Sequence, residues 1–249
     1  MPRTLMDVLR RDFPHVEDVE GAVRAGKVAV DRVVRQNPAF RVRAGAHVTV
    51  ADDQPLRGEA KLRAAIEGFE VDVAGRVALD VGASAGGFTR VLLESGATRV
   101  YAVDAGHGQL VGSLRQDARV VNLEATNLGV LTPERVPDAI ELFTVDVSYL
   151  SLSAAVAQLN RVRIAPRAQL VGLVKPMFEL RLPEAPVDDA RIEEARLRAE
   201  EGLRAAGWEV AGAMHSPVRG ARGAREMLVY ARRGAQGGAE AEVTGGVSR

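Results

Sequence analysis

Between residues 61 and 231 the sequence alternates between two hydrophobic periods, and this alternation limits the possible folds more than any other feature. Apolar residues recur at helical spacing over 61–69, 87–95, 109–116, 152–160 and 188–206. Short runs rich in Val, Leu and Ile, typical of buried strands, cover 76–81, 99–104, 120–123, 141–147, 169–175, 208–214 and 226–231. Because strands that alternate with helices pair in parallel, the pattern predicts an α/β fold with about seven mostly parallel strands.

The first fifty residues have a different pattern. Helical spacing predicts two short helices over 4–11 and 16–24, and short strand-like runs at 27–34 and 42–50 predict a small sheet. We therefore expect a small α+β domain over 1–52, a linker over 53–60 and the α/β domain over 61–233. Residues 234–249 are rich in Gly, Ala and Glu without an apolar period, so we expect a disordered tail there.

Composition excludes several kinds of site and partner. The 249 residues contain no Cys and four scattered His, so no metal site is expected. No apolar run approaches the ~18 residues of a membrane helix, and the N-terminus lacks the apolar stretch of a signal peptide. We expect a cytoplasmic protein that does not bind membranes. The 33 basic and 33 acidic residues balance, so a nucleic acid would have to be bound by a local basic surface.

Lysine is rare in this chain. Only three of the 33 basic residues are lysines: Lys27, Lys61 and Lys175. Arginine stays protonated in proteins, whereas a lysine can lose its proton when its surroundings shift its pKa. The three lysines can therefore mark positions that need a titratable amine, which arginine cannot supply. Chance alone explains the same count.

A glycine-rich loop follows the first strand of the α/β part, at residues 82–87. Its glycines, Gly82, Gly86 and Gly87, let the backbone turn sharply and approach a ligand closely. Nucleotide-like ligands bind to such loops at the carboxyl ends of parallel strands. A plain strand–turn–helix connection is the structural alternative.

Two acidic residues indicate which ligand this loop binds. Asp104 ends the second strand, where a carboxylate can accept hydrogen bonds from ribose hydroxyls. The loop spacing does not match the G-x-G-x-x-G pattern of dinucleotide sites. Asp80, just before the loop, suits a cationic ligand such as S-adenosylmethionine (SAM) better than a phosphate. Asp80 could instead be structural and bind N–H groups of the loop.

Several segments in a fixed order carry a resemblance that spans residues 4–232: 78–89, 100–110, 124–127, 145–152, 173–179, 216–217 and 226. With these segments the chain resembles the TlyA family of ribosomal RNA 2′-O-methyltransferases, whose members are also called haemolysins. The resemblance implies an S4-like RNA-binding domain at 1–52 and an FtsJ-like domain with a Rossmann-like class I methyltransferase fold at 61–233. It also implies SAM as cofactor and ribosomal RNA or ribosomal subunits as partners.

The resemblance implies a catalytic Lys–Asp–Lys–Glu tetrad, which falls on Lys61, Asp146, Lys175 and Glu226. A ribose 2′-hydroxyl must lose its proton as it attacks a methyl group. A free lysine, with a pKa near 10.4, is a poor base at neutral pH, so burial or a neighbouring positive charge is needed. We hypothesise that Lys175 is the general base, that Asp146 orients it, and that Lys61 and Glu226 position and tune it.

Each of these residues also has a structural interpretation. Lys175 could be an exposed residue at a strand end, and Lys61 a solvated helix residue. Asp146 could cap the following helix. Glu226 could be an edge charge paired with Arg225.

The resemblance extends to residues that would touch ligands. The expected cofactor-binding residues are Asp80, Gly82, Ala83, Ser84, Gly86, Gly87, Phe88, Asp104, Glu124 and Asp146. A basic cluster in the N-terminal part suits RNA phosphates and consists of Arg24, Lys27, Arg32, Arg35, Arg41 and Arg43. A solvated charged face is the alternative for that cluster.

Three stretches depart from the family pattern: 57–60, 180–186 and 223–225. They border the substrate side, so the target nucleotide is less constrained than the cofactor. Other functions stay open at this point: a noncatalytic RNA-binding protein that keeps the cofactor fold, a small-molecule methyltransferase and a membrane-active haemolysin. The lack of an apolar span argues against the last of these.

Overall fold

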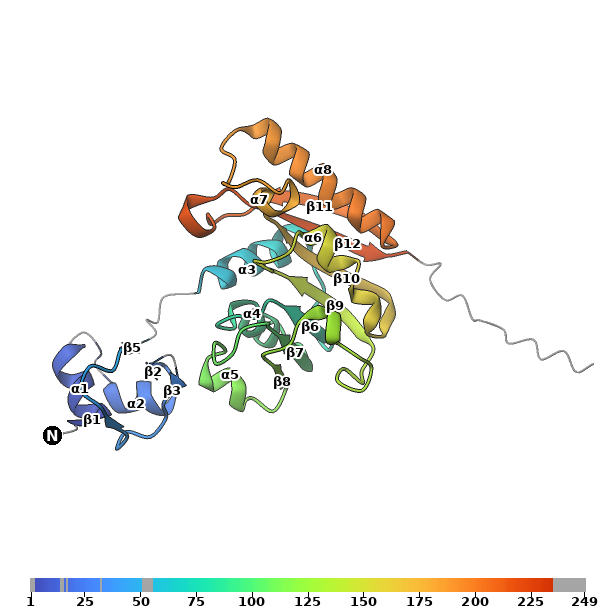
Figure 1. Ribbon diagram of the computed structural model, residues 1–249. Helices are drawn as coiled ribbons and strands as arrows, with labels where there is room; N and C mark the ends of the chain where they lie inside the picture. Colours follow the sequence, from blue (N-terminus) through green and yellow to red (C-terminus); the bar gives the residue numbers. More distant parts are fainter. Residues whose placement is uncertain (1–2, 14–15, 17, 32, 51–55, 235–249) are drawn as a thin grey trace, which may run out of the picture.

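The computed structural model describes residues 3–13, 16, 18–31, 33–50 and 56–234, which fall into a small N-terminal part and a larger α/β domain (Figure 1). In the N-terminal part the described elements are β1 (Arg3–Thr4), α1 (Leu5–Asp12), α2 (Val19–Arg24), β2 (Val28–Val30), β3 (Val33–Val34), β4 (Arg41–Val42) and β5 (Val48–Val50). Strand β2 pairs antiparallel with β3 and with β5, and β1 pairs with β4. The helices and the hairpin agree with those predicted from the sequence.

The α/β domain is built on one seven-stranded sheet over residues 56–234, with the order β11-β12-β10-β9-β6-β7-β8. Its strands are β6 (Val77–Val81), β7 (Arg99–Val103), β8 (Val120–Leu123), β9 (Ile140–Val145), β10 (Ile164–Val174), β11 (Trp208–His215) and β12 (Met227–Arg233). Its helices are α3 (Arg57–Phe69), α4 (Gly87–Glu94), α5 (Gly112–Gln116), α6 (Leu152–Val156), α7 (Pro176–Glu179) and α8 (Asp189–Ala205). Strand β12 runs antiparallel to β10 and β11, and the other pairs are parallel. The predicted α/β fold is confirmed.

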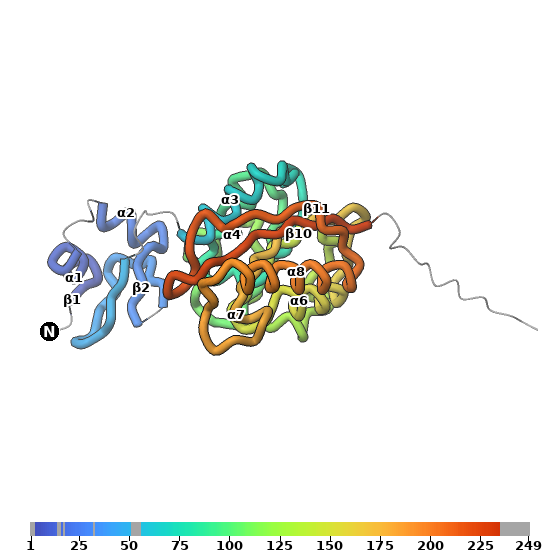
Figure 2. Tube along the Cα trace, turned by 90° about the horizontal axis from the view of Figure 1, so that it is seen from above, coloured from blue at the N-terminus to red at the C-terminus, as the bar shows by residue number. Residues whose placement is uncertain are grey.

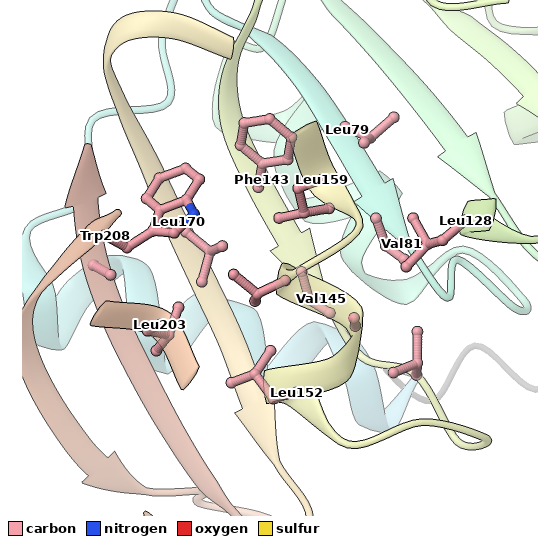
Figure 3. Packing of buried hydrophobic residues seen from close by; sticks show 14 of the residues in the cluster. Leu79, Val81, Leu128, Phe143, Val145, Leu152, Leu159, Leu170, Leu203 and Trp208 are labelled. Carbon is pink, nitrogen blue, oxygen red and sulfur yellow. The ribbon is translucent and has the colours of Figure 1, made fainter. Parts of the chain in front are cut away.

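Helices cover both faces of the sheet. Figure 2 shows α3 and α4 on one side of it and α6, α7 and α8 on the other. Each side has its own apolar core, one with Leu62 and Phe88 and one with Leu152 and Leu203. On the α8 side the rings of Phe143 and Trp208 meet edge to face, with centroids 5.6 Å apart (Figure 3). Such two-sided burial explains why the central strands β6, β7 and β9 are mostly buried and largely apolar.

Several element boundaries differ from those predicted. Helix α3 begins at Arg57, so the carboxyl half of the expected linker at 53–60 is helical. The carboxylate of Glu59 accepts hydrogen bonds from the N–H of Leu56 and from Arg90 of α4, which fixes this first turn against the domain. A glycine such as Gly58 is typical of a loop, but in this helix it leaves room for the ring of Phe88, which packs against it. Residues 53–55 and 235–249 lie outside the described residues.

Two predicted helices are shorter than expected. Helix α5 begins at Gly112 because the N–H groups of Gln109 and Leu110 both donate to Glu124 instead of facing a helix. The helix expected over 152–160 is divided into α6 and a 3₁₀ turn at Leu159–Arg161.

The fold brings several chain segments to one edge of the sheet. Strands β6, β7, β9 and β10 are parallel, so their carboxyl ends share this edge. Strand β12 begins there, because Met227 pairs with Val174 at the end of β10 and with His215 at the end of β11. Ligands of open α/β sheets bind outside this edge.

Candidate active site

The four residues of the predicted tetrad lie together at this edge. Asp146 follows β9 and Lys175 follows its parallel neighbour β10, and Nζ of Lys175 lies 2.6 Å from Oδ1 of Asp146. Oδ2 of Asp146 lies 3.8 Å from Nζ of Lys61, which α3 carries. Nζ of Lys61 donates a 2.7 Å hydrogen bond to Oε2 of Glu226, just before β12. The side chains form a chain of alternating charge.

Burial differs along this chain of charges. The side chains of Lys61 and Glu226 are 7% and 5% exposed, whereas those of Lys175 and Asp146 are 13% and 20% exposed. A shielded ion pair therefore stands behind a more accessible lysine amine. A buried pair of this kind is held in one geometry, because separating it would leave a charge buried without a partner.

Three structural interpretations from the sequence are wrong. Lys61 is buried, so it is not a solvated helix residue. Glu226 pairs with Lys61, while the guanidinium of Arg225 points to α8 instead. The hydroxyl of Ser151, not Asp146, caps α6.

Sequence reasoning missed two residues that hold the tetrad. The hydroxyl oxygen of Ser148 accepts a 2.8 Å hydrogen bond from Nζ of Lys175. Ser148 lies two residues after Asp146 in a segment that resembles the family, so the spacing was a usable signal. Gly220 lies against Glu226 so closely that a Cβ atom there would overlap Oε1. Nothing in the sequence near Gly220 indicated that contact.

The glycine loop connects β6 to α4 and packs against the rest of the site. Gly82, with φ +86°, lies so close to the carbonyl of Asp146 that a Cβ would overlap it. Gly86, with φ +99°, lies under Leu114 of α5. The loop glycines therefore allow close approach within the chain itself. The other predicted cofactor residues of this segment are Ala83, Ser84, Gly87 and Phe88, of which Ser84 is exposed and the rest are buried.

Asp104 and Glu124 shape the loops beside the glycine loop. The carboxylate of Asp104 accepts hydrogen bonds from the N–H groups of Ser84, at 2.9 Å, and Gly106, at 2.6 Å. That of Glu124 accepts from the N–H groups of Gln109 and Leu110 and pairs with Arg115. Burial raises the pKa of Glu124, but these hydrogen bonds and one from Asn122 outweigh burial and hold it below its ordinary value. Glu124 is therefore ionised at neutral pH.

Asp80 lies beneath the glycine loop and is fully buried. Its two carboxylate oxygens accept hydrogen bonds from the hydroxyls of Thr89, at 2.6 Å, and Thr144, at 2.8 Å. Burial raises the pKa of Asp80 to about 6, although both hydrogen bonds act in the opposite direction. Asp80 thus ties β6 to α4 and β9, and its predicted contact with a cationic ligand stays a prediction.

A cavity of about 480 Å³ lies between two segments that follow tetrad residues in the chain. It is lined by segments 149–154 and 177–183, the stretches that follow Ser148 and Lys175. Tyr149 is half-exposed at this cavity. The walls of this cavity are mainly aromatic and aliphatic, with Ser151 and Arg181 as polar members.

Comparison with known proteins places the chain in a family. Residues 56–233 match the FtsJ-like methyltransferase family. Over 221 residues the chain is 40% identical to the 16S/23S rRNA (cytidine-2'-O)-methyltransferase TlyA of Mycobacterium tuberculosis. The matched region covers 84% of this chain and 81% of the relative. The chain belongs to the FtsJ-like methyltransferase family, and within it to the TlyA proteins.

Solved structures agree with this membership. A hemolysin-named protein from Streptococcus thermophilus superposes with a TM-score of 0.68 at 29% identity, over 94% of this chain and 89% of the other. Fibrillarin from Aeropyrum pernix, solved with bound SAM, superposes with a TM-score of 0.52 at 18% identity, over 82% and 87% of the two chains. At that identity fibrillarin shows a shared fold only. The resemblance to the TlyA family and the class I methyltransferase fold are confirmed.

The family match begins where α3 begins and ends where β12 ends, so the N-terminal part lies outside it. Three predicted RNA contacts there already have partners: Arg24 pairs with Glu20 (2.8 Å), Arg43 pairs with Asp31 (3.0 Å), and Arg35 lies over the ring of Phe40 (4.2 Å). The two ion pairs are exposed and therefore weak, whereas Arg35 is half-buried. Lys27 is half-buried, Arg41 is exposed, and Arg32 lies outside the described residues.

No helix within the described residues is long and apolar enough to cross a membrane. No group of three His, Asp or Glu side chains in the described part of the chain could hold a metal ion.

Proposed function

We propose that this protein transfers a methyl group from SAM to a ribose 2′-hydroxyl of ribosomal RNA. The observation that carries the proposal is the Glu226–Lys61–Asp146–Lys175 chain beside the glycine loop, with a 2.6 Å contact between Nζ of Lys175 and Oδ1 of Asp146. The named activity of the Mycobacterium tuberculosis relative is ribose methylation of ribosomal RNA. From this relative we infer the reaction and the class of RNA for the present protein, but not the nucleotide that is methylated.

The residues at the carboxyl edge fit SAM as cofactor. The loop at 82–88 contains no basic side chain, so a phosphate there would have only backbone N–H groups as partners. Asp104 and Glu124 flank it, and each carboxylate oxygen of Asp104 accepts one N–H and keeps capacity for another donor, such as a ribose hydroxyl. We propose that these residues, together with Asp80 and Asp146, hold SAM. When bound, SAM supplies an electrophilic methyl group on a sulfonium.

Lys175 is the proposed general base. A neutral lysine amine has two N–H bonds and one lone pair. Asp146 accepts one N–H and Ser148 accepts the other, which leaves the lone pair of Nζ for the 2′-hydroxyl proton. Holding the base and the hydroxyl in line with the reacting carbon supplies proximity, and proton removal supplies a further ~10²–10⁴-fold in rate.

Lys61 and Glu226 position Asp146 from behind. Glu226 fixes the ammonium of Lys61, whose positive charge lies near the Asp146 carboxylate. That charge attracts the Asp146 carboxylate and holds it in place. The pair is a positioning element, because neither side chain needs to touch the RNA.

We assign RNA binding to the N-terminal part, as an S4-like domain over residues 1–52, with Arg24, Lys27, Arg32, Arg35, Arg41 and Arg43 as its phosphate contacts. Structured RNA is bound mainly through its shape and backbone, which suits arginines in weak surface pairs. A ribosomal substrate would place the protein in the cytoplasm.

The test is transfer of labelled methyl from SAM to purified ribosomal subunits and to naked ribosomal RNA. We expect label in RNA, and we expect that label to survive in alkali-resistant dinucleotides, because a 2′-O-methyl group blocks cleavage of the adjoining bond. Cofactor binding without label on any RNA would refute the proposed reaction and favour a noncatalytic RNA-binding role.

A further inference from the structure

The loop between β11 and β12 carries a three-residue repeat that the proposed reaction does not use. Residues 219–225 read Arg-Gly-Ala-Arg-Gly-Ala-Arg, with arginines at 219, 222 and 225. The loop begins after His215 and ends at Glu226, so it lies at the carboxyl edge and runs directly into the tetrad. Figures 1 and 2 show it projecting on the side of the α/β domain that faces the N-terminal part.

Arg225 holds this loop to its neighbour. Its guanidinium donates to the carbonyl of Val187, at 3.3 Å, and to Oδ1 of Asp189, at 2.6 Å. Val187 lies in the connection into α8, which contains the second stretch that departs from the family pattern, and Asp189 is the first residue of α8. Arg225 therefore ties two substrate-side loops together, and its own charge is compensated by Asp189.

The other two arginines face solvent. Arg219 is exposed and donates to the carbonyl of Gly223, at 3.2 Å, which braces the loop. Arg222 is exposed, and its side chain makes no hydrogen bond or ion pair with any residue that the structure describes. Its backbone is left-handed, with φ +54°, a conformation that costs an arginine on the order of 1 kcal/mol. A glycine would meet this backbone requirement without strain.

The local charge is uncompensated. Glu226 is the one acidic residue among residues 216–226, and it is already bound to Lys61. Arg219 and Arg222 therefore present two positive charges that no carboxylate of their own loop neutralises. Guanidinium groups bind phosphate oxygens in a bidentate manner, and their planar form fits a polyanion better than an isolated carboxylate.

From this placement we infer that Arg219 and Arg222 bind backbone phosphates of the RNA next to the target ribose, with Arg225 as the positioning residue of the loop. The inference rests on the proposed function. Because the same loop supplies Glu226, phosphates bound here would fix the RNA strand directly beside Lys61 and Lys175. The surface would extend RNA binding from the N-terminal part to the catalytic edge.

The test measures RNA affinity of the full-length protein as a function of salt, with the ribosomal RNA that the wild type methylates as probe. Each lost phosphate contact lowers the slope of log affinity against log salt by about 0.7–0.9. We expect R219A/R222A to lower the slope by about 1.5 and to raise the RNA KM by about tenfold or more. SAM affinity should stay at the wild-type value.

Two single variants separate charge from backbone effects. Arg222→Gly removes the strain together with the charge, so it should weaken RNA binding without lowering the melting temperature. Arg222→Lys keeps a positive charge and should restore part of the lost affinity. If Arg222→Gly binds RNA as the wild type does, Arg222 has no phosphate contact and the inference is wrong.

The control pair lies at the opposite edge of the sheet. Arg163 and Arg167 are exposed at the amino end of β10, and Arg167 has a left-handed φ of +61°, close to that of Arg222. We expect R163A/R167A to match the wild type in salt slope and KM.

Four results would contradict the inference. If R163A/R167A loses as much RNA affinity and salt slope as R219A/R222A, the effect depends on the total charge of the protein and not on this loop. Loss of methyl transfer by R219A/R222A with unchanged RNA affinity and slope would mean that the loop acts through Glu226 alone. A wild type that neither binds nor methylates ribosomal RNA would refute the proposed function itself, and this inference with it. If the wild type methylates ribosomal RNA and R219A/R222A has the same RNA affinity, salt slope and KM as the wild type, only the inference is refuted.

Discussion

Asp80 and Gly220 lie next to the tetrad without belonging to it, and each keeps one part of the site in place. Asp80 joins β6 to Thr89 and Thr144 from below the glycine loop. Gly220 leaves the space that Glu226 occupies. Their effects are separable, because Asp80 acts through a buried charge and Gly220 acts through an absent side chain.

We predict that Asp80→Asn removes a pH dependence of stability. The folded-state pKa of about 6 is above the ordinary 3.8, so the folded protein holds this proton more tightly than the unfolded chain does. Ionising the buried Asp80 carboxyl lowers the free energy of unfolding. This cost is absent below pH 3.8, and stability falls as pH rises from there to about 6. Asparagine can still bond both hydroxyls. Denaturant unfolding should show the variant more stable than the wild type by about 1–3 kcal/mol at neutral pH and equal to it near pH 4. A pH profile of Asp80→Asn equal to that of the wild type would contradict this prediction, whereas weaker SAM binding by the variant would support the proposed contact of Asp80 with SAM.

Gly220→Ala should lower activity much more than stability. Its φ of −72° suits any residue, so the only conflict is the overlap of the new methyl group with the flexible end of Glu226. Displaced Glu226 would release Lys61, and we expect a loss on the order of 10²-fold in methyl transfer rate with little change in melting temperature. Gly129→Ala is the control, because a Cβ there lies at an ordinary 3.5 Å from Gln158. Wild-type activity of Gly220→Ala would mean that Glu226 is not needed in its observed position.

At the scale of elements, the glycine loop is held between α4 and α5. Gly86 begins α4 at φ +99°, and Leu110 and Leu114 pack over it. The loop after β7 meets the same region through the bond from the Ser84 N–H to Asp104. The shape of the proposed cofactor site therefore depends on α5 as well as on the glycines.

Gly86→Ala should damage this site. An alanine pays about 1–2 kcal/mol to adopt the left-handed backbone, and its methyl group would push Leu114 aside. We expect a lower melting temperature and SAM affinity reduced by about tenfold or more, measured by calorimetric titration. A variant that binds SAM as the wild type does would show that α5 does not shape the cofactor site.

Much of the element pattern was predictable, for a physical reason. Buried parallel strands are apolar along their length, so their number and order of appearance are visible in the sequence. The first turn of α3 was not predictable, because it depends on Arg90 of α4 reaching back to Glu59. The assembly of the tetrad was expected from the resemblance, whereas the bond from Lys175 to Ser148 and the bonds of Asp80 to two threonines come from tertiary contacts. A sequence pattern shows which side chains reach one edge but not which of them satisfy each other.

At the scale of the whole molecule, the N-terminal part has a core of its own, with Leu5, Leu9 and Val23 fully buried. It meets the α/β domain at α5. Nε2 of Gln116 donates a 2.6 Å hydrogen bond to Oε1 of Gln36. A Cβ on Gly112 would lie 3.2 Å from Cα of Gly26 and 3.0 Å from a methyl group of Val34. The N-terminal part thus rests on the helix that also covers Gly86.

Gly112→Val should separate the two functions of the molecule. The larger side chain would push the N-terminal part away from α5, while the two cores are distinct and should each remain folded. We expect melting within a few degrees of the wild type, SAM affinity nearly unchanged and kcat/KM for ribosomal RNA lower by about tenfold. Unchanged kcat/KM would mean that this contact does not set how RNA is presented to the tetrad.

The most direct test of the central claim is single-turnover methyl transfer by Lys175→Met, which keeps the length of the side chain and removes the amine. With saturating SAM and the ribosomal RNA that the wild type methylates, the account predicts a rate lower by about 10²–10⁴-fold. Affinities for SAM and RNA should stay within about twofold of the wild type, since the loop and the basic surfaces are untouched. A Lys175→Met protein that transfers methyl at a near wild-type rate would show that Lys175 is not the base.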